Sequence, residues 1–247
     1  MPIYEPRQVE YAIIHGNISI VLDGGGALPA YWAHPDIGGT FPAIALIHDW
    51  WGITALERRL AHLLAQSGYY VIVPDLFNGQ VATTPEEALA LVRALGEQGY
   101  GCVNTALQTI ENHVRSNRST GVIGLGMGGS LAFEAAIKRN DLEAAVALYG
   151  FPQRYFGQFS ALQAPLLAIF GSKDPYVRPK AIARLRRELA AAAVAHDLVV
   201  LEGASRSFFD AAYSASAGAI AWQKTTEFMA RLLHGPSTPP APTLMTL

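Results

Sequence analysis

The stretch with the strongest chemical character is GVIGLGMGGSLAF, at residues 121–133. A β-branched run enters a turn dense in glycine, and the turn opens an alanine-rich segment that suits a helix. A sharp strand-to-helix turn of this kind can hold a nucleophile, with small residues two positions before and after it. Gly124 and Gly128 are those small residues, so the nucleophile position is Gly126, which has no side chain.

The same run also satisfies a second pattern, the dinucleotide fingerprint G-x-G-x-x-G, through Gly124, Gly126 and Gly129. That fingerprint opens the first strand–helix–strand unit and is followed about 20 residues later by an acid at the end of the next strand. Here at least four expected strands precede the run, and the next one ends at residues 148–151 without an acid. The spacing therefore disfavours NAD binding and leaves it as a minor alternative.

The bulk composition narrows the class of protein. Of 247 residues, 51% are hydrophobic and 15% charged, which is ample for a large core and too apolar for disorder. The net charge of −2 includes no basic block, so nucleic acid is not expected as a partner. No apolar run reaches the roughly 18 residues of a membrane span, and the N-terminus does not resemble a signal peptide. We therefore expect a cytoplasmic protein without a membrane partner.

Cysteine and histidine placement says little about bound groups. The single cysteine excludes a disulfide framework, and the seven histidines show no metal-ligand spacing. The sequence thus predicts no metal and no cofactor, and it does not give the oligomeric state.

Strand and helix patterns alternate along the chain, which predicts a parallel sheet covered on both faces. We expect one domain over residues 1–235 and a proline-rich, disordered tail over 236–247. A β-rich, antiparallel start covers residues 9–16, 18–22 and 28–34. The later expected strands lie at 41–48, 69–73, 144–149, 165–170 and 197–201, besides the strand within 121–133.

Four segments that follow expected strands carry candidate chemistry: residues 49–52, 124–129, 171–174 and 203–208. In open parallel sheets, ligands bind outside the carboxyl ends of the strands, so these segments should meet. Their order is oxyanion loop, nucleophile turn, acid and base, which is the chain order of α/β-hydrolases.

At these segments the chain resembles the dienelactone hydrolase family. HDWWG at 48–52 is similar to the family's loop after the first buried parallel strand, and GLGMGG at 124–129 to its G-x-C-x-G-G turn. GSKDPYV at 171–177 resembles the acid turn, and EGASRSF at 202–208 the histidine turn, usually E-G-A-x-H-x-F. The resemblance covers roughly residues 10–233. It implies an α/β-hydrolase fold and hydrolysis of carboxylic esters or lactones.

Two departures from the family pattern remove its chemistry. The family's cysteine is Gly126 here and its histidine is Arg206; only the acid, Asp174, remains. Covalent acyl transfer needs an attacking sulfur or oxygen and a base within reach of it. Glycine supplies no such atom, and arginine stays protonated and cannot accept the proton. The sequence therefore predicts a degraded triad and lost or strongly impaired hydrolysis.

The remaining groups predict a binding pocket. The backbone amides of Trp50 and Met127 should converge as an oxyanion-hole pair at the start of a helix. Arg206 should form an ion pair with Asp174, extending toward Asp49, and should depress the pKa of both carboxyls. Such a pocket suits a small-molecule ligand such as a carboxylate, ester or lactone. Its further lining residues are expected to be His48, Asp49, Trp51, Tyr149 and Phe208.

A working hydrolase with a non-standard mechanism stays open as an alternative. Asp49, which stands where the family commonly has glutamate, or Asp174 could activate a water directly. An unrecognised nucleophile is the other route. Its candidates, each with a structural role as the favoured interpretation, are Cys102, Ser130, Ser205 and Ser207.

Overall fold

One sheet of eight strands runs through the computed structural model, which describes residues 10–22, 25–209 and 215–235. The strand order is β1-β2-β4-β3-β5-β6-β7-β8, and every neighbouring pair from β4 to β8 is parallel. The predicted α/β fold is therefore confirmed, whereas the predicted tail at 236–247 lies outside the described residues. The strands are β1 (Ile13–Val21), β2 (Ala27–Pro35), β3 (Phe41–Ile47), β4 (Tyr70–Pro74), β5 (Ser116–Leu125), β6 (Ala144–Leu148), β7 (Leu166–Gly171) and β8 (His196–Leu201).

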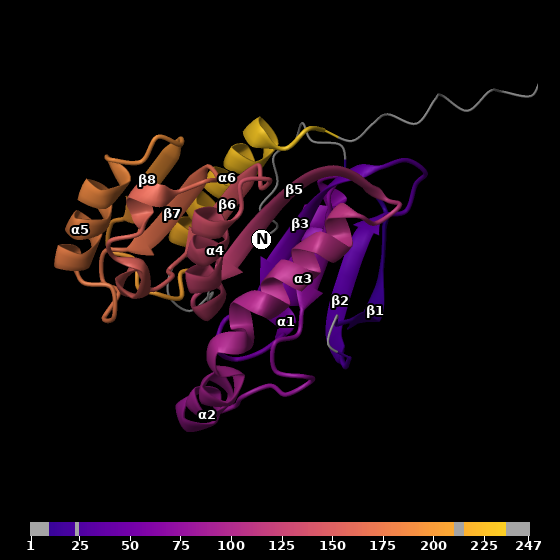
Figure 1. The fold of residues 1–247 in the computed structure, drawn as a ribbon, viewed down its shortest axis with the longest axis horizontal. Helices are drawn as coiled ribbons and strands as arrows, with labels where there is room; N and C mark the ends of the chain where they lie inside the picture. Colours follow the sequence, from indigo (N-terminus) through magenta and orange to yellow (C-terminus); the bar gives the residue numbers. More distant parts are fainter. Residues whose placement is uncertain (1–9, 23–24, 210–214, 236–247) are drawn as a thin grey trace, which may run out of the picture.

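Helices cover both faces of this sheet (Figure 1). The buried side chains of α1 and α6 pack on one face, and those of α3, α4 and α5 pack on the other. Strands β3, β4, β6 and β7 are buried along their whole length, as continuous apolar runs in a doubly covered sheet should be. The helices are α1 (Ala55–Gln66), α2 (Pro85–Leu95), α3 (Gly99–Glu111), α4 (Met127–Lys138), α5 (Pro179–Leu189) and α6 (Ala215–Leu232).

The antiparallel start of the sheet is simpler than the sequence suggests. Residues 9–16 and 18–22 were expected as two strands, but β1 runs without a break through Gly16 and pairs with β2 along its length. Gly16 lies under the Trp32 ring, where a β-carbon would stand 3.3 Å from the indole. The glycine therefore makes room for a cross-strand tryptophan rather than ending a strand.

Capping boxes fix where two helices begin. Thr54 accepts a hydrogen bond from the Leu56 amide, and the Glu57 carboxylate accepts from the Thr54 amide at 2.8 Å. Thr84 and Glu87 form the same arrangement at the start of α2. The first box holds the end of the loop that follows β3, one of the four candidate segments.

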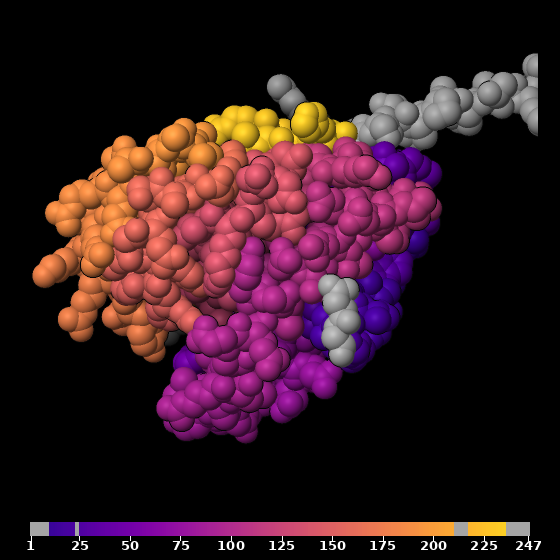
Figure 2. All heavy atoms as spheres, viewed as in Figure 1, coloured from indigo at the N-terminus to yellow at the C-terminus, as the bar shows by residue number. Residues whose placement is uncertain are grey.

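The second of these helices, α2, stands away from the sheet. Ala88 is its only buried residue, and Leu89 is 41% exposed. Figure 2 shows this segment as a projection at the lower left edge of the molecule. Within the described residues, no helix has the length and apolar character needed to cross a membrane.

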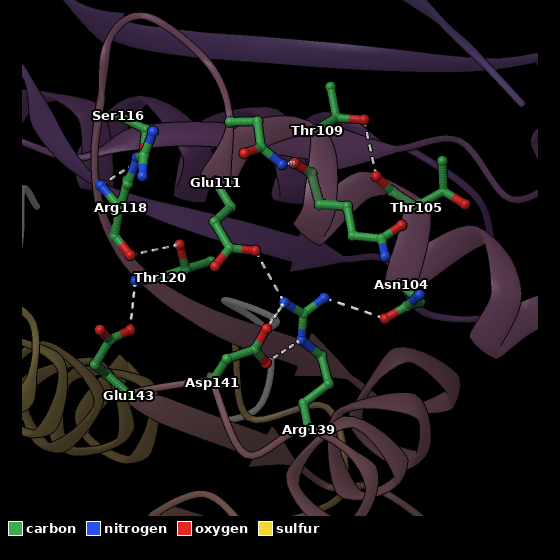
Figure 3. Close-up of polar contacts among 12 residues, drawn as sticks. Asn104, Thr105, Thr109, Glu111, Ser116, Arg118, Thr120, Arg139, Asp141 and Glu143 are labelled. Atoms are coloured by element: carbon green, nitrogen blue, oxygen red, sulfur yellow. Dashed lines mark hydrogen bonds and ion pairs between the residues drawn. The ribbon is translucent and has the colours of Figure 1, made fainter. Parts of the chain in front are cut away.

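A buried arginine, Arg139, links α4 to α3 at the edge of the sheet where the parallel strands begin (Figure 3). The Arg139 guanidinium donates two hydrogen bonds to Asp141, at 2.8 and 2.7 Å, one to Glu111 and one to Asn104. Its side chain is only 7% exposed. These bonds join the end of α4 to α3 at the side of the sheet opposite the candidate segments.

We expect Arg139→Ala to lower the free energy of unfolding by about 2 kcal/mol, because the charged hydrogen bonds are lost while the two carboxylates can rehydrate. Urea denaturation measures the change. Arg231→Ala is the matched control, since its ion pair with Asp197 is exposed on both sides and should contribute below about 0.5 kcal/mol. Equal effects of the two substitutions would contradict a structural role for Arg139.

Candidate functional site

The strand-to-helix turn at Gly126 has the strained geometry of a nucleophile turn. Gly126 has φ 54° and ψ −107°, a conformation that side chains disfavour, and it directly precedes α4. The neighbouring glycines permit close backbone contact: a β-carbon on Gly124 would lie 2.0 Å from the Gly128 carbonyl oxygen, and one on Gly128 would lie 2.3 Å from that of Ile47. Backbone packing therefore explains the glycines without a phosphate group.

The two predicted amide donors converge on one atom, and that atom belongs to the protein. The amides of Trp50 and Met127 each donate a hydrogen bond of 2.8 Å to the same oxygen, Oδ1 of Asp49. The two N–H groups thus converge on one point, and their role as an oxyanion-hole pair stays a prediction. What the sequence did not predict is that a carboxylate of the same chain already fills the pair.

Gly126 provides the space for this carboxylate. A β-carbon at position 126 would lie 2.0 Å from Asp49 Oδ1 and 2.1 Å from its Cγ. No real side chain could coexist with Asp49 in this position. The absent nucleophile and the bound carboxylate are therefore two aspects of one local structure.

The predicted ion pair at the base position is present. Arg206 donates from its Nη1 to Oδ2 of Asp174 at 3.0 Å, and the Asp174 side chain is fully buried. The other carboxylate oxygen of Asp174 accepts hydrogen bonds from the amides of Tyr176 and Val177. An arginine held in this way is a fixed cation and offers no proton acceptor.

Aromatic rings surround the arginine. The Arg206 guanidinium carbon lies 4.2 Å from the centre of the Phe151 ring, 5.3 Å from that of Tyr149 and 5.6 Å from that of Tyr176. These distances favour cation–π attraction. Tyr149 itself has φ 43°, which is rare for a bulky residue, and its ring packs edge-on against Phe208 at 5.1 Å. Tyr149 thus lies beside Arg206, and Phe208 packs against Tyr149; their role as pocket-lining residues stays a prediction.

His48 holds the loop in place and is not free to act as a base. Its Nδ1 donates to the Asp49 carbonyl oxygen at 2.6 Å, and its Nε2 accepts from the Leu76 amide at 3.0 Å. The ring is fully buried, and this burial lowers the pKa of His48. Both ring nitrogens of His48 are therefore used in hydrogen bonds to the backbone. These bonds connect the loop after β3 to the loop after β4.

The two tryptophans of the loop differ in their surroundings. The Trp50 ring packs against the core on the α3–α4 face, whereas Trp51 meets Trp50 edge-on at 5.1 Å. Trp50 contributes an amide to the site, and Trp51 contributes its carbonyl oxygen to the Ala82 amide.

Three of the four alternative nucleophiles, Ser130, Cys102 and Ser205, show no activating base among the described residues. Ser130 donates to the Gly126 carbonyl oxygen and accepts from the Phe151 amide, so it supports the turn. Cys102 lies within α3, where burial raises the pKa of its thiol. Ser205 Oγ is buried without a hydrogen-bond partner among the described residues, so no base activates it.

The expected pKa depression at Asp49 is wrong. Burial raises the pKa of Asp49, and this outweighs the lowering by the two amide hydrogen bonds and by the Arg206 charge. A buried negative neighbour, Glu57, adds to the increase. Glu57 was missed as a site neighbour because its capping-box position explains it fully; only the fold brings it close to Asp49.

The raised pKa predicts a pH-dependent effect of Asp49→Asn. The folded state holds the Asp49 proton to higher pH than the unfolded chain does, so this contribution to stability is complete at low pH and is lost as pH rises through the folded pKa. Asparagine can accept both amide bonds without titrating. We therefore expect the stability of Asp49→Asn relative to wild type to increase from pH 4 to pH 7, measured by urea denaturation. A constant difference would contradict it.

Comparison with known proteins identifies the family. The family model for the dienelactone hydrolase family matches residues 28–233, which is most of the chain. The chain belongs to the dienelactone hydrolase family. A carboxymethylenebutenolidase from Rhodococcus opacus is 29% identical over 228 residues, covering 85% of this chain and 88% of the relative. Protein usf from Aquifex pyrophilus is 26% identical over 222 residues, covering 85% and 95%.

Solved structures agree on the fold of this family member. A putative dienelactone hydrolase from Klebsiella pneumoniae superposes with a TM-score of 0.81 at 24% identity, covering 89% of this chain and 99% of the other. The dienelactone hydrolase-like phosphotriesterase P91 from metagenomic libraries gives 0.81 at 19% identity, covering 90% and 100%. At these identities the likeness concerns the fold; the chemistry depends on the residues described above.

Proposed function

We propose that this dienelactone hydrolase family member has lost covalent ester and lactone hydrolysis and keeps a pocket that binds a small carboxylate. The ion pair between Arg206 and Asp174 carries this proposal. The acid that would orient a base instead holds a permanent cation, and the nucleophile position, Gly126, is empty. Loss of any triad member typically reduces a hydrolase to a residual ~10³–10⁴-fold rate enhancement over water.

The proposed ligand follows from the fixed donors and charges. The Arg206 cation and the aromatic rings beside it suit the negative oxygens and small apolar body of a short carboxylate. The two amide N–H groups become donors to such a ligand when it displaces the Asp49 carboxylate from them. A carboxylate is also what hydrolysis of an ester or lactone releases. The proposed ligand therefore belongs to the same chemical class as the acid that ester or lactone hydrolysis releases.

The raised pKa of Asp49 favours one second candidate, hydrolysis by a water that Asp49 activates. A carboxyl with a raised pKa is a better general base at neutral pH. Against this candidate stands the position of its oxygen. Oδ1 fills the amide pair that would have to stabilise the oxyanion, so one atom would be needed in two places.

Assays with short aryl esters and lactones test the proposal. We expect no wild-type turnover above buffer, because Asp49 fills the amide pair that would supply the residual rate enhancement. Rescue should need three substitutions, Gly126→Cys, Arg206→His and Asp49→Ala, because the carboxylate of Asp49 blocks a side chain at 126. The matched control places alanine at 126 in the same background. Wild-type turnover that Asp49→Asn abolishes would instead support the Asp49-activated water.

A further inference from the structure

The amide pair of Trp50 and Met127 already holds a carboxylate, that of Asp49. Both hydrogen bonds to Asp49 Oδ1 are 2.8 Å long, the usual length of a charge-assisted bond. The Met127 amide lies at the start of α4, where backbone dipoles favour negative charge. A donor pair of this kind stabilises any oxyanion placed at the same point.

Asp49 occupies the amide pair because its side chain belongs to the loop that carries one of the two amides. Asp49 directly precedes Trp50, so its short side chain reaches the amide of the next residue, while Met127 comes from 78 residues further along the chain. The absence of a β-carbon at Gly126 leaves space for the carboxylate. Asp49 thus links the loop after β3 to the turn after β5.

An outside anion competes with this internal one. While Asp49 stays in place, both amide donors are used, and the charges of Asp49 and Glu57 repel a further carboxylate. Removing the Asp49 carboxylate would free both donors, remove one negative charge and leave a space the size of a carboxylate.

We propose that the amides of Trp50 and Met127 form a small-carboxylate site that the chain closes with its own Asp49, so that an external carboxylate binds only where the Asp49 carboxylate is removed or displaced. This inference rests on the proposed function and specifies how the pocket is controlled. The smallest external probe that reproduces the Asp49 terminus is formate.

The test compares Asp49→Ala with Asp49→Asn in formate titrations. In Asp49→Ala, formate should raise the midpoint of thermal unfolding by about 2 °C or more, and a chloride titration at equal ionic strength should not. Wild type and Asp49→Asn, whose side-chain oxygens still accept from both amides, should show no such rise. Isothermal titration calorimetry on the same three proteins should detect formate binding by Asp49→Ala alone.

Two outcomes would overturn the proposal: no response of Asp49→Ala to formate, or equal responses in all three proteins. If Asp49→Ala does not fold by itself, the protein is refolded with and without formate. Recovery of folded protein only in formate supports the site, and failure to refold under both conditions overturns the proposal. Formate binding involves no turnover. Its failure would leave the proposed loss of hydrolysis intact, and wild-type ester turnover would overturn that loss whatever formate does.

Discussion

Gly126→Ala is expected to lower the free energy of unfolding by about 4 kcal/mol, an unusually large effect for one methyl group. One part is backbone strain, about 1–3 kcal/mol, since φ 54° with ψ −107° disfavours a β-carbon. The other part is the displaced Asp49 carboxylate, whose charge-assisted hydrogen bonds contribute about 1.5–3 kcal/mol each before it finds other partners. Urea denaturation measures the sum.

A double-mutant cycle separates these two parts. With Asp49→Ala already present, Gly126→Ala meets no carboxylate, and its cost should fall to the strain alone, about 1–3 kcal/mol. Gly203→Ala is the matched control, because Gly203 has φ 74° but nothing within 4 Å of an added β-carbon. It should cost about 1–2 kcal/mol. The same cost for Gly126→Ala in both backgrounds would show that Asp49 does not occupy the space at 126.

Arg206→Met is expected to cost about 3 kcal/mol, because it leaves the fully buried Asp174 carboxylate without its cation. The two backbone hydrogen bonds to Asp174 remain, which limits the loss. The aromatic rings also lose a cation but keep an apolar neighbour of similar length. The measurement is again the free energy of unfolding in urea.

Arg231→Met provides the control for this substitution. Arg231 pairs with Asp197 at 3.2 Å, but the two side chains are 62% and 55% exposed. Such a pair should contribute below about 0.5 kcal/mol. If Arg206→Met proved as mild as Arg231→Met, then Arg206 would not neutralise Asp174, and the account of the degraded base position would lose its support.

The proposals about the site connect these two stability effects to function. In this family member, the amide pair and the acid that hydrolysis would use are both occupied by internal partners, and His48 is not free to act as a base. Asp49 fills the amide pair, Arg206 neutralises the acid, and His48 uses both ring nitrogens on the backbone. The stability of these contacts is the physical reason we propose binding rather than turnover.

Much of the architecture could be predicted from the chain alone. Apolar runs such as residues 41–47 predict buried parallel strands, and the threonine–glutamate pairs mark two helix starts. Residues 9–16 and 18–22 were predicted as two strands, but β1 runs through Gly16 as one strand. Only the pairing with β2, which places Gly16 under the Trp32 ring, shows this continuity. Sequence patterns thus predict an element correctly where interactions between neighbouring residues determine it. They fail where a side chain distant in the sequence determines it.

The sequence by itself determined which atoms are missing. Glycine at 126 and arginine at 206 exclude a nucleophile and a base whatever the fold, and the motif order placed Arg206 next to Asp174. Only the tertiary structure decided what fills the vacancy, because Asp49 and Met127 lie 78 residues apart and meet only when β3 and β5 pair. The same burial raises the pKa of Asp49, where charge counting along the sequence predicted the opposite. Desolvation depends on the packed surroundings, and no sequence pattern reports it.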